Sequence, residues 1–150
     1  MSSQGSDLIV AVLATADAFL RESQRLFKPF GLTGAQYNVL NVLSDRPDGM
    51  SQRELSDVLV VDRSNVTGLL DRMEKAGWVK RGDDPEDRRV YRVSLTAAGK
   101  KLWSKVQPRY AAEVETLTSG FSAAQMKATT EFLRELEKAA IGRRHEETTK

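Results

Sequence analysis

The sequence has no cysteine and a single histidine among its 150 residues. Without cysteine the chain can form no disulfide bond, has no thiolate nucleophile and cannot sense oxidants through a thiol. His145 stands in a polar C-terminal segment without the companion ligands that a zinc site needs. No glycine-rich phosphate loop follows a predicted strand, and the paired acids lie in a turn beside arginines, where they stay ionised. We therefore expect no metal, no cofactor and no catalytic activity.

The sequence also lacks a long hydrophobic run. The apolar stretch near its start, LIVAVLATADAFL at residues 8–20, contains Asp17 and is too short to span a bilayer. No basic segment of the kind found in secretion signals precedes it. We expect a cytoplasmic protein that does not associate with membranes. At 40% hydrophobic residues the chain can bury one core, so residues 1–150 are expected to form a single domain.

Charge is distributed unevenly, although the net charge is only +2. Residues 62–109 hold 12 Lys and Arg against 7 Asp and Glu, which gives +5, whereas the remaining residues sum to −3. No segment combines a strongly basic face with a large apolar face, as a membrane-surface helix does. The basic middle of the chain is therefore more typical of a surface that contacts nucleic acid.

Apolar residues at helical spacing predict four helices in the first half of the chain. The first covers about residues 7–30 and ends before Gly31, and Thr33 caps the second. Ser51 and Glu54 form the capping-box pattern of a short third helix. Its expected buried face consists of Leu55, Val58 and Leu59. The fourth helix is expected to begin near the capping residue Asp62, to end at Gly77 and to bury Val66, Leu69, Leu70 and Met73.

A hairpin and two further helices are expected in the second half. Residues 79–81 and 90–95 are predicted strands joined by an acidic loop. Thr96 caps a long fifth helix that Pro108 is expected to kink, and Ser122 begins the last helix, followed by a polar tail expected to fray. The predicted fold class is therefore mainly α with a small two-stranded wing, a winged helix-turn-helix with long terminal helices.

The outer face of the fourth helix carries the residues best suited to DNA. Short or amide-bearing side chains let a helix approach the major groove closely and exchange hydrogen bonds with bases and phosphates. Six candidate contact residues lie on or beside this face: Arg63, Ser64, Asn65, Thr67, Gly68 and Arg72. A glycine inside a helix costs about 1 kcal/mol relative to alanine, so Gly68 indicates close approach of another surface. The alternative is that these residues are merely polar and solvent-facing.

The acidic loop offers a second candidate contact. Asp87 stands two residues before Arg89, close enough for its carboxylate to hold the guanidinium in one orientation. An arginine fixed at a hairpin tip can enter the minor groove, whose negative potential attracts it, and Arg88 remains available for a phosphate. The alternative is that the sequence DDPED forms only a solvated acidic turn.

Taken together, these features resemble the MarR family of bacterial transcriptional regulators. The resemblance rests on SQRELSDVLVVDRSNVTGLLDRMEKAGWVKR, on the wing motif DPEDRR and on LTAAG, in this order. It implies a DNA-binding lobe at about residues 33–95, and dimerisation helices at about residues 7–30 and 97–141. It also implies that the fourth helix is the recognition helix and that Arg89, braced by Asp87, is the wing-tip arginine. Relatives often have a longer side chain where this chain has Gly68.

The resemblance further implies a homodimer on double-stranded DNA, and the wide apolar faces of the terminal helices support such a dimer independently. A self-packed monomer is the alternative. Family members commonly release DNA when a small aromatic or phenolic ligand binds, so a repressor controlled in this way and bound to a pseudo-palindromic operator is expected. Candidate pocket residues are the aromatic ones near the expected cleft, which also fit a plain core: Phe19, Phe27, Phe30, Tyr37, Trp103 and Tyr110. A winged-helix protein-interaction module is the alternative function.

Overall fold

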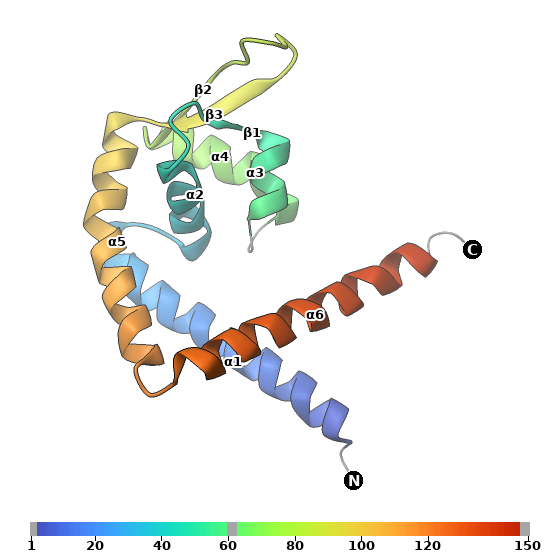
Figure 1. Cartoon of the computed structure of the whole chain (residues 1–150). Coiled ribbons are helices and arrows are strands. Elements are labelled where there is room, and N and C mark those ends of the chain that lie inside the picture. The colour runs from blue at the N-terminus through green and yellow to red at the C-terminus, as the bar shows by residue number, and fades with distance from the viewer. Residues whose placement is uncertain (1–2, 60–62, 148–150) are drawn as a thin grey trace. The chain divides into compact units, whose positions relative to one another are not determined.

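A computed structural model describes residues 3–59 and 63–147 (Figure 1). The chain forms two compact units, Met1–Tyr110 and Ala111–Lys150, and each is described by itself. The first unit contains the helix-turn-helix, the wing and the long N-terminal helix. The second contains the end of the fifth helix and all of the sixth. The mainly helical fold with a small antiparallel wing confirms the predicted fold class.

Helix α1 covers Gln4–Phe27 and continues into a 3₁₀ turn at Lys28–Phe30, which Gly31 ends with a φ of 69°. The hydroxyl of Ser3 caps its N-terminus by accepting a hydrogen bond from the amide of Ser6. Helix α1 thus begins three residues before the predicted range 7–30, and the 3₁₀ turn ends at the predicted residue. Phe27 is its buried residue, whereas most of its remaining apolar side chains are exposed.

Helices α2 (Gly34–Ser44), α3 (Gln52–Val58) and α4 (Val66–Lys75) form the helix-turn-helix lobe. Thr33 caps α2 and Ser51 caps α3, each in a complete capping box, as the sequence predicted. The prediction that Val58 is buried is wrong, because its side chain is 48% exposed. Leu59, which follows the last residue of α3, is buried as predicted. The expected capping residue Asp62 lies outside the described residues, and α4 is preceded by a 3₁₀ turn at Arg63–Asn65.

The sheet has three strands, one more than the predicted hairpin. Strands β2 (Val79–Asp83) and β3 (Tyr91–Leu95) form the expected antiparallel pair, which extends away from α2, α3 and α4 in Figure 1. The additional strand β1 is only Met50–Ser51 and pairs with the other edge of β3, giving the order β1-β3-β2. Two residues are too few to show an alternating pattern, so β1 could be found only from its pairing.

The core of the first unit joins every element of this lobe. It contains the buried stripe of α4, as the sequence predicted, together with residues of α2, α3 and the sheet. Its fully buried large side chains are Phe27, Val39, Leu40, Leu43, Leu55, Leu59, Leu69, Leu70, Met73, Val79, Val93 and Val106. Val106 belongs to the first half of α5, so this helix takes part in holding the lobe together.

Helix α5 covers Ala97–Thr118 and α6 covers Ala123–Glu147. The hydroxyl of Thr96 accepts a hydrogen bond from the amide of Gly99 at 3.0 Å, and that of Ser122 accepts one from the amide of Gln125 at 3.1 Å, so both predicted caps are present. A Cβ on Gly99 would collide with the carbonyl group of Trp78, which explains the glycine of the LTAAG motif. Pro108 lies inside α5, where its predicted kink stays a prediction.

Helix α6 continues to Glu147, so the tail that was expected to fray is helical up to that residue. Within the described part of the chain, none of the helices has a stretch apolar and long enough to cross a membrane.

Candidate nucleic-acid interface

The outer face of α4 is available because its opposite face is buried. Val66, Leu69, Leu70 and Met73 point into the core, and this orientation leaves the predicted contact residues on the outside. Ser64, Asn65, Thr67 and Arg72 are exposed, and Gly68 is half-buried. Of Arg63 only the backbone is described, at the start of the 3₁₀ turn before the helix. The structure therefore places the described candidates on one end and one side of α4.

A residue that the sequence analysis missed orients Thr67. The side-chain amide of Gln52, at the first position of α3, donates a hydrogen bond of 2.6 Å to the Thr67 hydroxyl. This bond ties the beginning of α3 to the outer face of α4 and restricts the Thr67 rotamer. The two residues are 15 positions apart, so no local sequence pattern could reveal the contact.

The wing has a turn that its own carboxylates stabilise. Oδ1 of Asp84 accepts hydrogen bonds from the backbone amides of Glu86 at 2.9 Å and Asp87 at 3.3 Å. These amide bonds and the neighbouring Arg92 guanidinium lower the pKa of the Asp84 carboxyl. The turn chemistry that the sequence predicted for DDPED is thus present, with Asp84 as its central acceptor.

The predicted contact between Asp87 and Arg89 is present at the tip of the wing. Nε and Nη2 of Arg89 donate to the two carboxylate oxygens of Asp87 at 3.1 and 3.3 Å, and the Arg89 backbone amide adds a third bond of 3.0 Å. The bond from the Arg89 side chain, followed by that from its amide, lowers the pKa of Asp87. The Arg89 side chain is nevertheless 90% exposed, and Arg88 beside it is also exposed. The guanidinium is therefore oriented by the protein while remaining accessible.

Two further arginines, which the sequence analysis did not select, hold the wing in place. Arg81 of β2 contacts Asp71 of α4 at 2.6 Å and Glu74 at 2.5 Å, so it joins the strand to α4. Partial burial lowers the pKa of Arg81, but its bonds to the two carboxylates outweigh burial and raise the pKa overall.

Arg92 of β3 makes the corresponding connection on the other side of the wing. Its guanidinium donates to the carbonyl oxygens of Asp48 at 3.0 Å and Gly49 at 2.6 Å and contacts Asp84 at 3.2 Å. The wing turn is thus linked to the loop before β1. Because side chains alternate along β3, Arg92 lies on the face of the sheet away from the buried Val93. This alternation could have identified Arg92 as a residue of the outer sheet face.

The six aromatic residues predicted for a ligand pocket do not form one group. The rings of Phe27 and Tyr37 are buried in the core and stack with centroids 4.5 Å apart. The Tyr110 ring stacks on Phe27 and is tilted by 44° against Tyr37. Phe30 is half-buried beneath the Arg109 guanidinium. Two of the six residues, Phe27 and Tyr37, therefore belong to the plain core that was the alternative explanation, whereas Tyr110 is 38% exposed beside them.

Trp103 is partly buried against the same core, and its indole donates a hydrogen bond of 3.1 Å to Asn41. Phe19 is exposed on α1.

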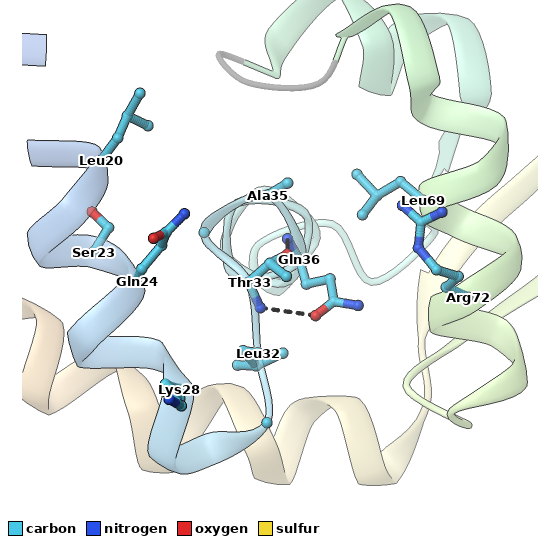
Figure 2. A pocket seen from close by; sticks show the side chains of 12 residues that line it. Leu20, Ser23, Gln24, Lys28, Leu32, Thr33, Ala35, Gln36, Leu69 and Arg72 are labelled. Carbon is cyan, nitrogen blue, oxygen red and sulfur yellow. Dashed lines mark hydrogen bonds between the residues drawn. The ribbon is translucent and has the colours of Figure 1, made fainter. Parts of the chain in front are cut away.

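A pocket of about 740 Å³ lies instead between α1, the beginning of α2 and α4, and none of the six aromatic residues lines it. Figure 2 shows Leu20, Ser23 and Gln24 of α1 on one side and Leu69 and Arg72 of α4 on the other. The remaining lining residues are Lys28, Gly31, Leu32, Thr33, Gly34, Ala35 and Gln36. The lining contains two cations and no carboxylate, which suits an anion with an apolar body.

A helix-turn-helix whose last helix, α4, keeps its outer face exposed, with a three-stranded antiparallel sheet beside it, defines a winged helix-turn-helix protein. The MarR family model matches residues 30–90. The transcriptional activatory protein BadR of Rhodopseudomonas palustris is 35% identical over 122 residues, which cover 79% of this chain and 69% of that protein. The homoprotocatechuate degradative operon repressor of Escherichia coli is 28% identical over 140 residues, 93% of each chain.

Among solved structures, CouR from Rhodococcus jostii RHA1 bound to p-coumaroyl-CoA superposes with a TM-score of 0.76 and 26% identity, covering 90% of this chain and 95% of that one. The chain belongs to the MarR family, which confirms the resemblance seen in its sequence. Its relatives are transcriptional regulators rather than enzymes.

Proposed function

We propose that this protein is a homodimeric repressor that binds a pseudo-palindromic operator. In each half-site α4 lies in the major groove and Arg89 enters the adjacent minor groove. The observation that carries this proposal is the wing tip, where Asp87 holds a guanidinium that is still 90% exposed. A protein-interaction module has no need of an arginine oriented in this way beside a helix with short outer side chains. As a regulator of bacterial genes, the protein would act in the cytoplasm.

The apolar surfaces of the long helices support a dimer. In the first unit, α1 exposes Ile9, Val10, Leu13, Phe19 and Leu20, each between 45% and 65%. In the second unit, Val114, Leu117, Phe121, Phe132, Leu133 and Ile141 are exposed as well. Exposure of many large apolar side chains on and beside long helices favours association. A second copy of the chain is the occupant that we propose, because half-sites about 34 Å apart require two recognition helices with two-fold symmetry.

We further propose that a small aromatic anion binds in the pocket between α1 and α4. The ligand carboxylate would pair with Lys28 or Arg72, and its ring would contact Leu20, Leu32 and Leu69. The CouR structure contains an aromatic acyl thioester, and the Escherichia coli relative is named for the degradation of an aromatic acid. These two relatives support an aromatic effector class for this chain.

The position of the pocket supplies a mechanism for release. Leu69 and Arg72 belong to α4, whereas Ser23 and Gln24 belong to α1, so a ligand that fills the pocket contacts both helices. An effector changes operator affinity only if it binds one arrangement of these helices better than the other. A small displacement of each α4 would alter the separation of the two recognition helices and weaken simultaneous binding of both half-sites.

Selection from a randomised duplex library tests the proposal directly. The wild-type protein should enrich inverted repeats, and binding to the enriched duplex should weaken steeply as salt increases, because phosphate contacts release counterions. Sedimentation of the complex should give two chains per duplex. Enrichment of no sequence, together with binding that is independent of salt, would favour the protein-interaction module instead.

The effector is tested with hydroxylated benzoates and phenylacetates added to the protein bound to its enriched duplex. Release of the duplex should need a higher ligand concentration in Lys28→Gln than in the wild type. Lys105→Gln, a surface lysine of α5 that does not line the pocket, is the matched control. Transcription in vitro from a promoter that contains the operator should decrease on addition of the protein, and an increase would show activation instead.

A further inference from the structure

Gly68 lies inside α4, three residues after Asn65, where a glycine weakens the helix. We expected another surface approaching the helix to explain it. The structure gives a nearer reason: a Cβ built on Gly68 would lie 2.7 Å from Oδ1 of Asn65 and 3.6 Å from its Cγ. The first distance is shorter than real Cβ contacts, so the Asn65 carboxamide occupies the space that a side chain at position 68 would need.

The Asn65 carboxamide also does not cap the N-terminus of α4, although its position predicts that it would. Asparagine is a preferred capping residue, and Asn65 stands at the cap position of α4. Among the described residues, however, its side chain makes no capping hydrogen bond. It lies exposed along the outer face of the helix, over Gly68. Its donor and acceptor groups are therefore not used to cap the N-terminus of the helix.

Arg72, one turn further along α4, lies farther than Asn65 from the position that a Cβ at residue 68 would take. Its Nη1 atom lies 3.5 Å from the Cβ position of Gly68, an ordinary van der Waals contact. A methyl group at position 68 would therefore displace the Asn65 carboxamide and leave Arg72 where it is. A substitution at position 68 can therefore show whether Asn65 or Arg72 is affected.

We propose that Gly68 determines the base preference of α4 by leaving room for the Asn65 carboxamide against the helix, where it contacts an adenine edge. This inference rests on the proposed function of α4 as the recognition helix. An asparagine amide can donate to N7 and accept from N6 of adenine in the pairing that suits the major groove. The pairing requires one orientation of the amide, and a side chain at position 68 would remove it. Gly68 is thus a positioning residue that acts through Asn65.

The test compares the wild type, Asn65→Ala, Gly68→Ala and the double variant on the duplex that the wild type enriches from a random library. Each single variant should bind about tenfold more weakly or worse, the loss expected for a missing bidentate base contact. The double variant should bind no more weakly than Asn65→Ala, since the two changes remove one contact. Libraries enriched by either single variant should lose the preference for adenine at the same position of each half-site.

Two controls separate this effect from folding. Gly142→Ala in α6, where a Cβ would meet no atom within 4 Å, makes the same change of residue in a helix, so it should raise thermal stability and leave operator affinity unchanged. Arg72→Ala combined with Gly68→Ala should give losses that add, because Arg72 does not shift. Additive losses for Asn65 and Gly68, or wild-type affinity of Gly68→Ala, would overturn the inference while the proposed function stands. Failure of the wild type to enrich any duplex would remove the proposed function and this inference with it.

Discussion

Replacement of Arg89 by alanine tests the wing most directly. The Arg89 side chain is 90% exposed and contacts Asp87 through two bonds of 3.1 and 3.3 Å. Exposed ion pairs contribute little to folding, so Arg89→Ala should unfold at the same temperature as the wild type and keep the oligomeric state of the wild type. A lost groove contact weakens binding by about 1–3 kcal/mol, which is roughly fivefold to 150-fold for each wing that contacts DNA.

Two neighbouring variants show whether orientation or charge causes this loss. Asp87→Ala retains the arginine but leaves its rotamers free, so DNA binding must then order a flexible side chain. Its operator affinity should therefore fall less than that of Arg89→Ala. Arg88 is exposed, and no ion pair holds its side chain among the described residues. Arg88→Ala should therefore weaken binding to all duplexes alike and reduce the salt dependence of binding.

The assay is a fluorescence anisotropy titration of labelled operator and of a scrambled duplex at several salt concentrations. Arg89→Ala should lose more affinity for the operator than for the scrambled duplex, because a minor-groove contact depends on groove width and therefore on sequence. Wild-type operator affinity for Arg89→Ala, or equal losses on both duplexes, would show that the wing does not contribute sequence preference.

Three other predictions concern the supporting structure. Arg81→Met should weaken operator binding because β2 loses its contacts to α4, and Arg81→Lys should recover part of the loss; the same titration would contradict this if the two variants bound equally. Tyr37→Phe should leave stability to urea unchanged or raise it by about 1 kcal/mol, since the buried hydroxyl has no hydrogen-bond partner among the described residues. Burial, with a smaller effect of Tyr110, raises the pKa of Tyr37 to about 12. An unfolded tyrosine ionises near pH 10, so the wild type should lose stability between about pH 10 and 12 relative to Tyr37→Phe, and parallel urea curves would exclude this cause. Ser51→Ala should destabilise the protein by about 1 kcal/mol in thermal unfolding through loss of the α3 cap, and an unchanged midpoint would refute the role of that cap.

Local sequence patterns were sufficient for the helices and for the wing turn. The capping boxes at Thr33 and Ser51 involve residues three positions apart, and the Asp87 and Arg89 contact joins residues two positions apart. Neighbours along the chain meet whatever the rest of the molecule does, so these contacts could be predicted. The exposure of Val58 could not be, because helical spacing alone does not show where the buried face of a short helix ends.

Contacts between distant residues needed the tertiary structure. Gln52 reaches Thr67, Arg92 reaches the Asp48 carbonyl, and β1 pairs with β3, although none of these partners are near in the sequence. The pocket is another case, since it is formed by α1, α2 and α4 together and contains no predicted aromatic residue. Aromatic residues in the sequence indicate burial, but only packing decides whether they fill a core or line a cavity.

The sequence by itself determined the family, the order of the helices, the caps and the braced arginine, because each depends on residue types at fixed short spacing. Tertiary structure alone decided which arginines hold the wing, where the pocket lies and which atoms a side chain at position 68 would meet. The last case joins the two: Asn65 and Gly68 are close in sequence, yet the direction of the Asn65 carboxamide is set by side-chain packing on the folded helix. Spacing in the sequence shows which residues are neighbours along a helix, whereas only the three-dimensional structure shows which of their atoms come into contact.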